Sequence, residues 1–185
     1  VICVDADMTT EAVKYGIELA GGTKDATLYL NTHKAKRKCD VKVCERDAMV
    51  KKIISEIKAN RPVYVCSDAK DDFHADVVSR VREVFQNDKD VMNRFKYYSG
   101  EDGDRKDFRH TEKWKNEVMF IFTSPTMTYG IDLNYAATVY GFYYCRTLNA
   151  LTCCQQLARI RQPQEIQLWF KPQPWRRVAN SVEDL

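Results

Sequence analysis

Apolar residues recur along this chain at two spacings, one typical of a buried helix face and one of a short buried strand. Residues 47–57 carry apolar side chains three and four positions apart, which predicts a helix with one buried face and a lysine-rich outer face. Residues 63–66 form a short apolar run, which predicts a buried strand. A second helix is expected from Asp72, with an apolar face made of Phe73, Val77, Val81, Val84 and Phe85. The alternation predicts an α/β fold with a largely parallel central sheet, flanked by helices on both faces.

Residues 117–161 hold most of the polar groups that suggest a function. An apolar run ends at Thr123, a turn containing Gly130 and Asp132 follows, and a second β-prone run leads to a helix-like segment. We expect the two runs to be adjacent buried strands that present polar groups at their carboxyl ends, where α/β sheets bind phosphates and nucleic acid. The arginines are expected on the helix, where a planar donor fork that keeps its charge would suit a phosphate. The polar residues of the helix-like segment are Gln155, Arg159 and Arg161.

Proline residues set the expectation for the end of the chain. Pro163 is expected to end the last helix, because the residue before a proline resists the α conformation. Residues 162–185 would then hold no long regular element. We expect one domain over residues 1–162 and a Pro/Trp-containing C-terminal extension over residues 163–185, with residues 1–8 assigned alternatively to the end of a preceding domain.

Composition restricts the class of protein only loosely. A chain of 185 residues suffices for one α/β domain, and 29 Lys plus Arg against 26 Asp plus Glu give a net charge of +3, too small to demand a nucleic-acid partner. Seven cysteines without a CxxC pair suggest neither a disulfide framework nor a metal site, so a reducing intracellular compartment fits best. No apolar run approaches the roughly 20 residues of a membrane span, and no membrane partner is expected. The chain opens in a predicted strand without a methionine, so we expect it to be part of something longer.

In combination, these segments resemble the second motor domain of superfamily 2 helicases. Residues 123–132 are similar to motif V, which ends in Gly-Ile-Asp, and residues 155–161 are similar to motif VI. Residues 1–7 resemble the motif III segment, residues 63–67 motif IV, and residues 97–102 the segment beside it. The Thr-Ser-Pro-Thr-x-x-Tyr-Gly character of motif V is most similar to that of herpesvirus-type replication origin-binding helicases. The resemblance spans nearly the whole chain and implies a RecA-like fold.

The resemblance also implies an activity and roles for individual residues. It implies an ATP-dependent DNA helicase involved in replication, in which this chain supplies an arginine finger and contacts to the strand. Ala158 stands where many relatives have glycine, and the two arginines lie two positions apart rather than three, so the resemblance leaves open which arginine is the finger. The implied catalytic residues are Arg159, Arg161 and Gln155, the implied nucleotide contacts are Gly130 and Asp132, and the implied nucleic-acid contacts are Ser67, Thr123 and Thr126.

The nucleotide-binding half of such a motor is missing from this sequence. A P-loop needs Gly-Lys followed by Ser or Thr, and no glycine in the chain is followed by lysine. By resemblance, ATP and Mg²⁺ would be bound mainly by an N-terminal motor domain of the same chain, and this fragment alone would be inactive. The expected partner is nucleic acid, in the form of single-stranded DNA. A viral protein of this kind would act in the nucleus or cytoplasm of an infected cell.

Two further segments each have two interpretations. The basic run at residues 33–38 would suit a phosphate backbone, and it would equally suit a solvated hairpin tip. The aromatic and basic cluster at residues 172–177 would suit stacking on nucleic-acid bases, although a hydrophobic anchor accounts for it as well.

A rival interpretation is an enzyme of another class. Asp5, Asp7 and Thr9 after an apolar run resemble the Asp-x-Asp-x-Thr signature of haloacid dehalogenase-type phosphatases, in which Asp5 would be the nucleophile, Asp7 the acid/base and Mg²⁺ the bridging ion. That family's later acidic motif should end a buried strand, whereas residues 98–102 are polar and loop-like. A third hypothesis is a motor-like domain without catalysis that only binds nucleic acid or protein.

Overall fold

The computed structural model describes residues 39–99, 120–125 and 133–172, and outside these ranges only Lys14, Tyr15, Glu18 and Gly21. The chain divides into two compact units, Val1–Arg37 and Lys38–Leu185, and the six strands of the sheet all belong to the second unit. Several sequence predictions lie outside the described residues, namely those on residues 1–8, 33–38, 126–132 and 173–185.

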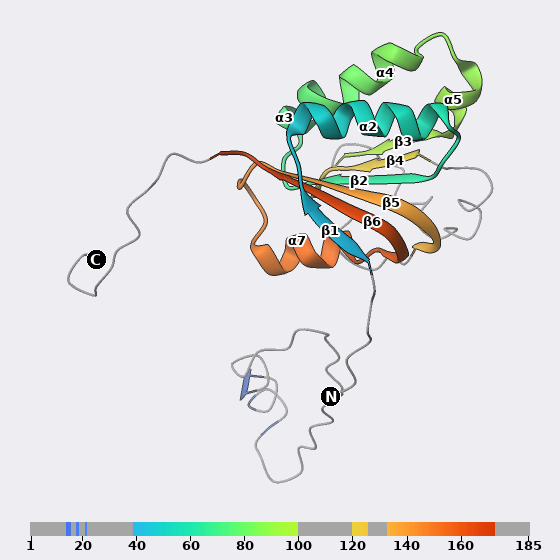
Figure 1. Cartoon of the computed structure of the whole chain (residues 1–185). Coiled ribbons are helices and arrows are strands. Elements are labelled where there is room, and N and C mark those ends of the chain that lie inside the picture. Colours follow the sequence, from blue (N-terminus) through green and yellow to red (C-terminus); the bar gives the residue numbers. More distant parts are fainter. Residues whose placement is uncertain are drawn as a thin grey trace. The chain divides into compact units, whose positions relative to one another are not determined.

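Six strands form one sheet in which every neighbouring pair runs parallel, in the order β1-β6-β5-β2-β4-β3 (Figure 1). The central strand β2 is buried at all five positions, which explains its continuous apolar sequence, since strands covered on both faces need no polar side. The predicted α/β class with a parallel central sheet is confirmed. The strands are β1 (Asp40–Val43), β2 (Val63–Ser67), β3 (Phe95–Tyr98), β4 (Phe120–Thr123), β5 (Leu133–Tyr143) and β6 (Ile160–Phe170).

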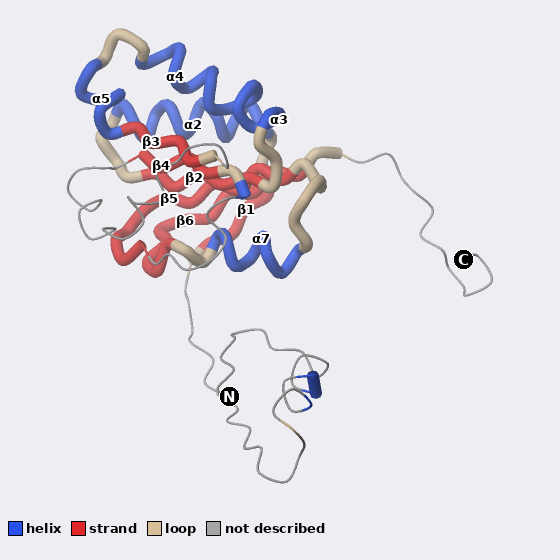
Figure 2. Tube along the Cα trace, turned by 180° about the vertical axis from the view of Figure 1, so that it is seen from behind, coloured by secondary structure: helices blue, strands red, loops and turns tan. Residues whose placement is uncertain are grey.

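Helices cover both faces of the sheet, but unequally (Figures 1 and 2). One face carries α2 (Arg46–Lys58), α3 (Asp71–Phe73), the π-helical turn η1 (His74–Val78), α4 (Ser79–Phe85) and α5 (Lys89–Arg94). The opposite face carries α7 (Ala150–Leu157). We refer to them as the α2 face and the α7 face. In the part of the chain that the structure describes, no helix has the length and apolar character needed to cross a membrane.

Most of the core lies on the α2 face. Aliphatic residues of α2, among them Met49 and Ile53, are fully buried, as the helical spacing predicts. Aromatic rings continue the packing from the strands: Phe122 of β4 lies 4.5 Å from Phe95 and 6.5 Å from Phe73, measured between ring centroids. Rings at such separations add attraction beyond the area that they bury.

The second predicted helix is interrupted by the π-helical turn η1. A π turn holds an extra residue, which rotates every later side chain around the helix axis. Val77 and Val81 are buried as predicted, and Val78 is buried in addition. Val84 is 49% exposed, so its predicted place in the core is wrong.

The two strands expected to be adjacent, β4 and β5, are separated by β2. β2 pairs with β4 on one side, Val63 opposite Phe120, and with β5 on the other, Val63 opposite Thr138. The expected adjacency is therefore wrong. The expectation that both strands end at one edge still holds, because all three run parallel.

The segment after α7 is also different from the prediction. The helix ends at Leu157, and β6 runs from Ile160 through Phe170, so the expectation of no long regular element beyond residue 162 is wrong up to residue 170. Pro163 is tolerated because the β5–β6 register shifts there: Ala137 pairs with Pro163, but Thr138 pairs with Glu165. A proline, which has no N–H to donate, is accepted in a sheet at such irregularities.

Candidate functional site

Helix α7 is joined to the ends of two strands by one buried side chain. The amide of Gln156 is fully buried, and its Nε2 donates to the carbonyl oxygen of Ser67 at 3.1 Å and to that of Ser124 at 3.3 Å. Ser67 ends β2, and Ser124 follows the last residue of β4. The segments that resemble motifs IV, V and VI therefore meet at this glutamine.

Arg159 lies in the turn that follows α7, and this turn is hydrogen-bonded to the start of β5. Its Nε donates to the carbonyl oxygen of Gln155 at 2.9 Å, and its backbone N–H donates to that of Gln156 at 3.3 Å. The carbonyl of Arg159 accepts a hydrogen bond of 2.8 Å from the N–H of Leu133, the first residue of β5. Leu133 follows the Gly-Ile-Asp sequence directly, so the start of β5 is held beside Arg159.

The two arginines are not on the helix, contrary to the expectation from the sequence. α7 ends at Leu157, Arg159 is half-buried in the turn, and Arg161 is exposed on β6. The predicted pair of Gln155 and Arg159 is in contact, but through the backbone carbonyl of Gln155. Arginine side chains at a turn and on an exposed strand position can reach a group outside the domain, which is what a phosphate-binding arginine requires.

The hydroxyls of Ser67 and Thr123 lie at the carboxyl edge, but both are fully buried and engaged within the chain. Ser67 Oγ accepts a hydrogen bond of 3.1 Å from the N–H of Ala69, and Thr123 Oγ1 donates to the carbonyl oxygen of Ser124 at 2.8 Å. Their predicted contact with nucleic acid stays a prediction. Thr126, Gly130 and Asp132 lie outside the described residues.

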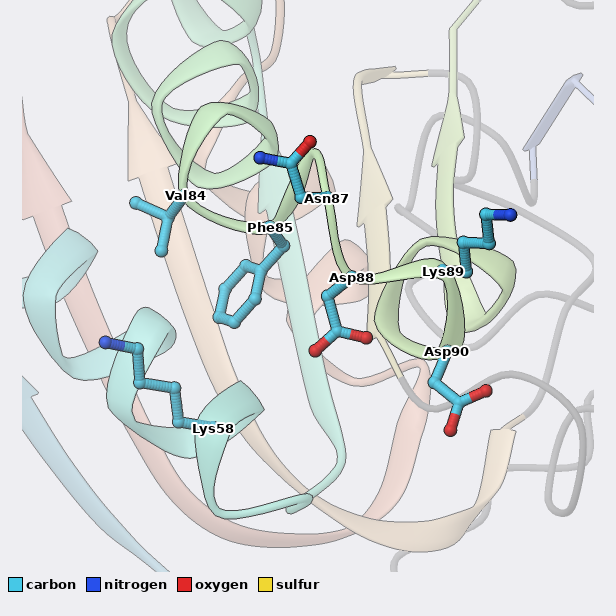
Figure 3. A pocket seen from close by; sticks show the side chains of 7 residues that line it. All are labelled: Lys58, Val84, Phe85, Asn87, Asp88, Lys89 and Asp90. Atoms are coloured by element: carbon cyan, nitrogen blue, oxygen red, sulfur yellow. The ribbon is translucent and has the colours of Figure 1, made fainter.

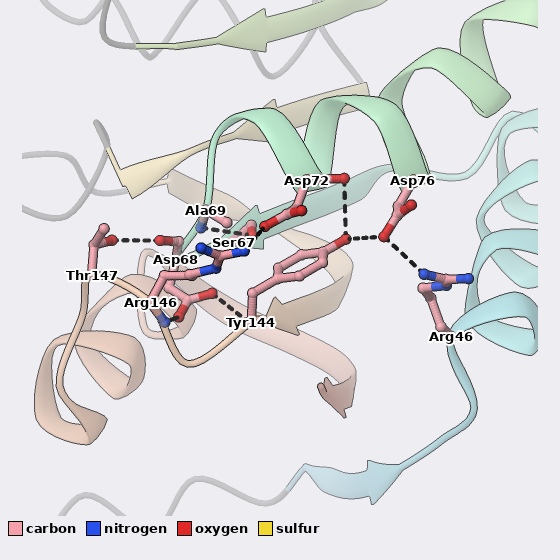
Figure 4. A network of polar contacts seen from close by, with 9 residues as sticks. All are labelled: Arg46, Ser67, Asp68, Ala69, Asp72, Asp76, Tyr144, Arg146 and Thr147. Atoms are coloured by element: carbon pink, nitrogen blue, oxygen red, sulfur yellow. Dashed lines mark hydrogen bonds and ion pairs between the residues drawn. The ribbon is translucent and has the colours of Figure 1, made fainter. Parts of the chain in front are cut away.

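Asp68, directly after β2, binds the loop that leads into α7 (Figure 4). Its buried carboxylate accepts hydrogen bonds from the N–H of Tyr144 at 2.6 Å and from the N–H of Arg146 at 2.7 Å. The residue between them, Cys145, has a left-handed backbone with φ of 57°, which turns both N–H groups toward the carboxylate. Thr147 adds a hydrogen bond from its hydroxyl to the Asp68 carbonyl. The end of β2 thus fixes the path of the chain into α7.

Tyr144 extends this network toward the α2 face (Figure 4). Its hydroxyl contacts the carbonyl oxygen of Asp72 at 3.3 Å and Asp76 Oδ2 at 3.0 Å, and Arg46 binds the same carboxylate oxygen at 2.8 Å. Burial raises the pKa of Tyr144 above its ordinary value, and the charge of Asp76 raises it further, so the hydroxyl stays a donor. Arg146 pairs with Asp72 at 3.0 Å.

Tyr143 provides a further link between β5 and α7. Its hydroxyl donates to the carbonyl oxygen of Cys153 at 3.1 Å and lies 3.7 Å from Cys66 Sγ. Burial raises the pKa of Cys66 to about 12, which keeps it a thiol at neutral pH. Gly141 permits α7 and β6 to pack closely against β5, because a Cβ at this position would lie 3.1 Å from Cδ2 of Leu157 on α7 and 2.9 Å from Cδ2 of Leu168 on β6.

The residues that hold α7 in place are not among those singled out by the sequence patterns. The motif resemblance implies Gln155 as the functional glutamine, whereas Gln156 is the one whose side chain is fully buried. The two glutamines are adjacent, and the sequence does not show which of them faces the sheet. Asp68 carries no local signal, because its partners follow it by more than 70 positions.

The described residues also form an open pocket of about 760 Å³, away from α7 (Figure 3). It lies on the α2 face, where α2 ends and the chain passes from α4 to α5, and is lined by Lys58, Val84, Phe85, Asn87, Asp88, Lys89 and Asp90. Its position separates it from the strand ends and the arginines. Within the described ranges, no group of three or more His, Cys, Asp or Glu residues is placed to hold a metal ion.

Comparison with known proteins adds little to this geometry. No protein-family model matches the chain, and a search of curated proteins finds no match. Among solved structures, the chain is similar to the C-terminal part of the Fun30 ATPase domain, with 16% sequence identity and a TM-score of 0.45. The match covers 68% of this chain and 40% of that structure. At this level the similarity assigns no function.

Proposed function

We propose that this chain is the second motor domain of an ATP-dependent DNA helicase of superfamily 2. The observation that carries the proposal is the convergence on α7: Gln156 binds the ends of β2 and β4, and Arg159 binds the start of β5. The segments resembling motifs IV, V and VI would need this convergence to act as one unit. It brings together segments that are far apart in the sequence, and the motif resemblance did not presuppose these contacts.

In this proposal, the chain contributes arginines to a nucleotide that another domain binds. An N-terminal motor domain of the same chain would hold ATP and Mg²⁺, and Arg159 or Arg161 would stabilise the charge that develops on the transferring phosphoryl group. Gly130 and Asp132 would line the nucleotide from this side, next to the start of β5, and Gln155 would hold Arg159 through its carbonyl. We further propose that the helicase is of the herpesvirus origin-binding type. A role in replication and a place in the nucleus or cytoplasm of an infected cell belong to the same proposal.

Single-stranded DNA is the proposed partner at the carboxyl edge. Since the hydroxyls of Ser67 and Thr123 are engaged within the chain, we propose that the strand meets the loops that follow β2 and β4 and the exposed side chain of Arg146. Contacts of this kind reach phosphates and give little preference for sequence.

The test is a titration of the chain with a labelled single strand at several salt concentrations. We expect weak binding whose log affinity falls with log salt by roughly 0.7 per phosphate contact. Arg146→Gln should reduce that slope by about one contact. Lys89→Gln, on the pocket of the α2 face, is the matched control and should leave the slope unchanged. A folded chain that binds no single strand even at low salt would contradict the proposal.

The phosphatase hypothesis is not favoured by any observation on the described residues. Asp5 and Asp7 belong to the first unit, Val1–Arg37, whereas the six strands all belong to the second. It is tested with p-nitrophenyl phosphate and Mg²⁺, where we expect no release above the blank. Phosphate release by the wild-type chain that disappears in Asp5→Asn would favour the phosphatase hypothesis instead.

A further inference from the structure

Gln156 is a fully buried polar side chain of which only one half is hydrogen-bonded. Its Nε2 makes two hydrogen bonds, to Ser67 and Ser124, while its Oε1 is buried and has no hydrogen-bond partner in the described part of the chain. Buried polar atoms in native proteins nearly always have a partner, so an unpaired acceptor calls for a reason. A leucine or methionine would fill the same space without burying an amide.

Holding α7 in place does not by itself supply that reason. The helix is also attached to β5 through the bond from Tyr143 to Cys153, and to β2 through the loop that Asp68 binds. Asn149 caps its first turn, with Oδ1 accepting from the N–H of Thr152 at 2.8 Å. These contacts would keep α7 in position if the amide of Gln156 were absent.

The two carbonyls that Gln156 binds are the places where the chain leaves the sheet at the carboxyl edge. Ser67 precedes the Asp68 loop, and Ser124 precedes the segment resembling the body of motif V. On the other side, the carbonyl of Gln156 accepts from the N–H of Arg159, and Arg159 in turn binds Leu133. One residue therefore connects both strand ends to the arginine through consecutive hydrogen bonds.

We propose that Gln156 is a positioning residue that couples strand binding at the ends of β2 and β4 to the placement of Arg159. The inference rests on the proposed function and deepens it by naming how the two halves of the site communicate. A shift of the Ser67 or Ser124 carbonyl moves the amide that binds it, and the backbone carbonyl of Gln156 passes the shift to the turn that carries Arg159. Oε1 has no partner among the described residues, so a rotation of the amide breaks no bond to this oxygen.

The test measures ATP turnover of the intact enzyme with and without single-stranded DNA. Gln156→Met keeps the volume and removes the donors, and it should lower the stimulation by DNA roughly tenfold, within the usual range of coupling between sites. The KM for ATP should change much less, because Gln156 does not contact the nucleotide in this proposal. Gln164→Met, at an exposed position on β6, is the matched control and should keep the full stimulation.

Gln156→Glu keeps the test decisive if the methionine variant does not fold. A carboxyl group has one donor, present only while it is protonated, so it can bind one of the two carbonyls, and burial raises the pKa of a carboxyl. Stimulation should therefore be lost at high pH and return as the pH falls, relative to wild type at each pH. A purely structural role would change stability without changing the stimulation ratio or its pH profile.

The outcomes separate this inference from the proposed function. The coupling role is overturned if DNA stimulates a folded Gln156→Met variant, or Gln156→Glu at every pH, as strongly as it stimulates the wild type. The motor function is left intact by that result. Wild-type enzyme that shows no ATP turnover overturns the motor function and the coupling role together.

Discussion

The two faces of the sheet are built differently. The α2 face buries a cluster of twenty described residues, mostly aliphatic and phenylalanine side chains, beneath α2 and the helices that follow it. The described cluster on the α7 face has nine buried residues, of which three are tyrosines, and α7 places a fully buried glutamine against it. The larger cluster removes more apolar surface from water and should supply most of the stability.

Helix α7, on the smaller and more polar face, leads to the candidate arginines. Gln156 and Arg159 belong to α7 or the turn after it, and Arg161 follows on β6. Buried polar contacts specify geometry, whereas apolar packing supplies most of the free energy. We therefore expect substitutions on the α2 face to lower stability, and substitutions at the arginines to lower activity.

The largest expected effect is on turnover, at the arginines. In the intact enzyme, Arg159→Ala and Arg161→Ala should each lower kcat while ATP binding persists. The variant that removes the arginine finger should lower kcat on the order of 10³-fold or more. Arg80→Ala, an arginine on α4 paired with Asp47, is the control and should keep kcat. Two near-neutral variants at positions 159 and 161 would mean that the motif VI resemblance is misleading.

The largest effect on stability should come from the α2 face. Phe122→Ala removes a fully buried ring that packs against Phe73 and Phe95, and should lower the free energy of unfolding by about 3–5 kcal/mol. Val84→Ala, exposed beyond the π-helical turn, should change it by less than about 0.5 kcal/mol. Urea unfolding of the chain measures both, and similar losses for the two variants would contradict the register described for α4.

The Asp68 network should give an intermediate effect. Asp68→Asn replaces one carboxylate oxygen by an N–H₂ group, which cannot accept from either Tyr144 or Arg146, so one buried backbone N–H loses its partner. The loss should be about 2 kcal/mol of unfolding free energy. Asp71→Asn, exposed at the start of α3, is the control. Equal stability of the two variants would show that the loop into α7 does not depend on Asp68.

The smallest effect should come from a tyrosine on the α7 face. The hydroxyl of Tyr64 is buried without a hydrogen-bond partner among the described residues, so Tyr64→Phe should be neutral or stabilising by up to about 1 kcal/mol. Tyr143→Phe removes a hydroxyl that bonds to Cys153 and should cost about 1 kcal/mol. The difference between the two variants, measured by urea unfolding, tests the partners assigned on this face. A larger loss of unfolding free energy in Tyr64→Phe than in Tyr143→Phe would contradict these hydrogen-bond assignments.

Local patterns in the sequence predicted elements better than their arrangement. The spacing of apolar residues predicted the helix α2, and the short apolar run predicted β2, because both signals come from neighbouring residues. The position of β2 between β4 and β5 depends on pairing across more than 50 residues, which no local pattern encodes. The strand through Pro163 was missed because its tolerance there depends on a register shift against Ala137 and Thr138.

The candidate site shows the same division. The motif resemblance singled out Arg159, which the structure places in contact with the start of β5. It did not single out Gln156, because the sequence offers two adjacent glutamines and only the exact end of α7 decides which one faces the sheet. The exposure of Val84 likewise leaves no local mark in the sequence, because Val84 lies between the buried Val81 and Phe85 of the same helix.

The most direct test of the motor proposal is ATP turnover by the chain alone and by the same chain joined to its N-terminal motor domain, each with and without single-stranded DNA. The proposal predicts background turnover by the chain alone, because its sequence contains no P-loop, and DNA-stimulated turnover by the joined protein. Turnover by the chain alone that survives repurification and increases with DNA would contradict it, and so would a folded joined protein that binds ATP but never hydrolyses it.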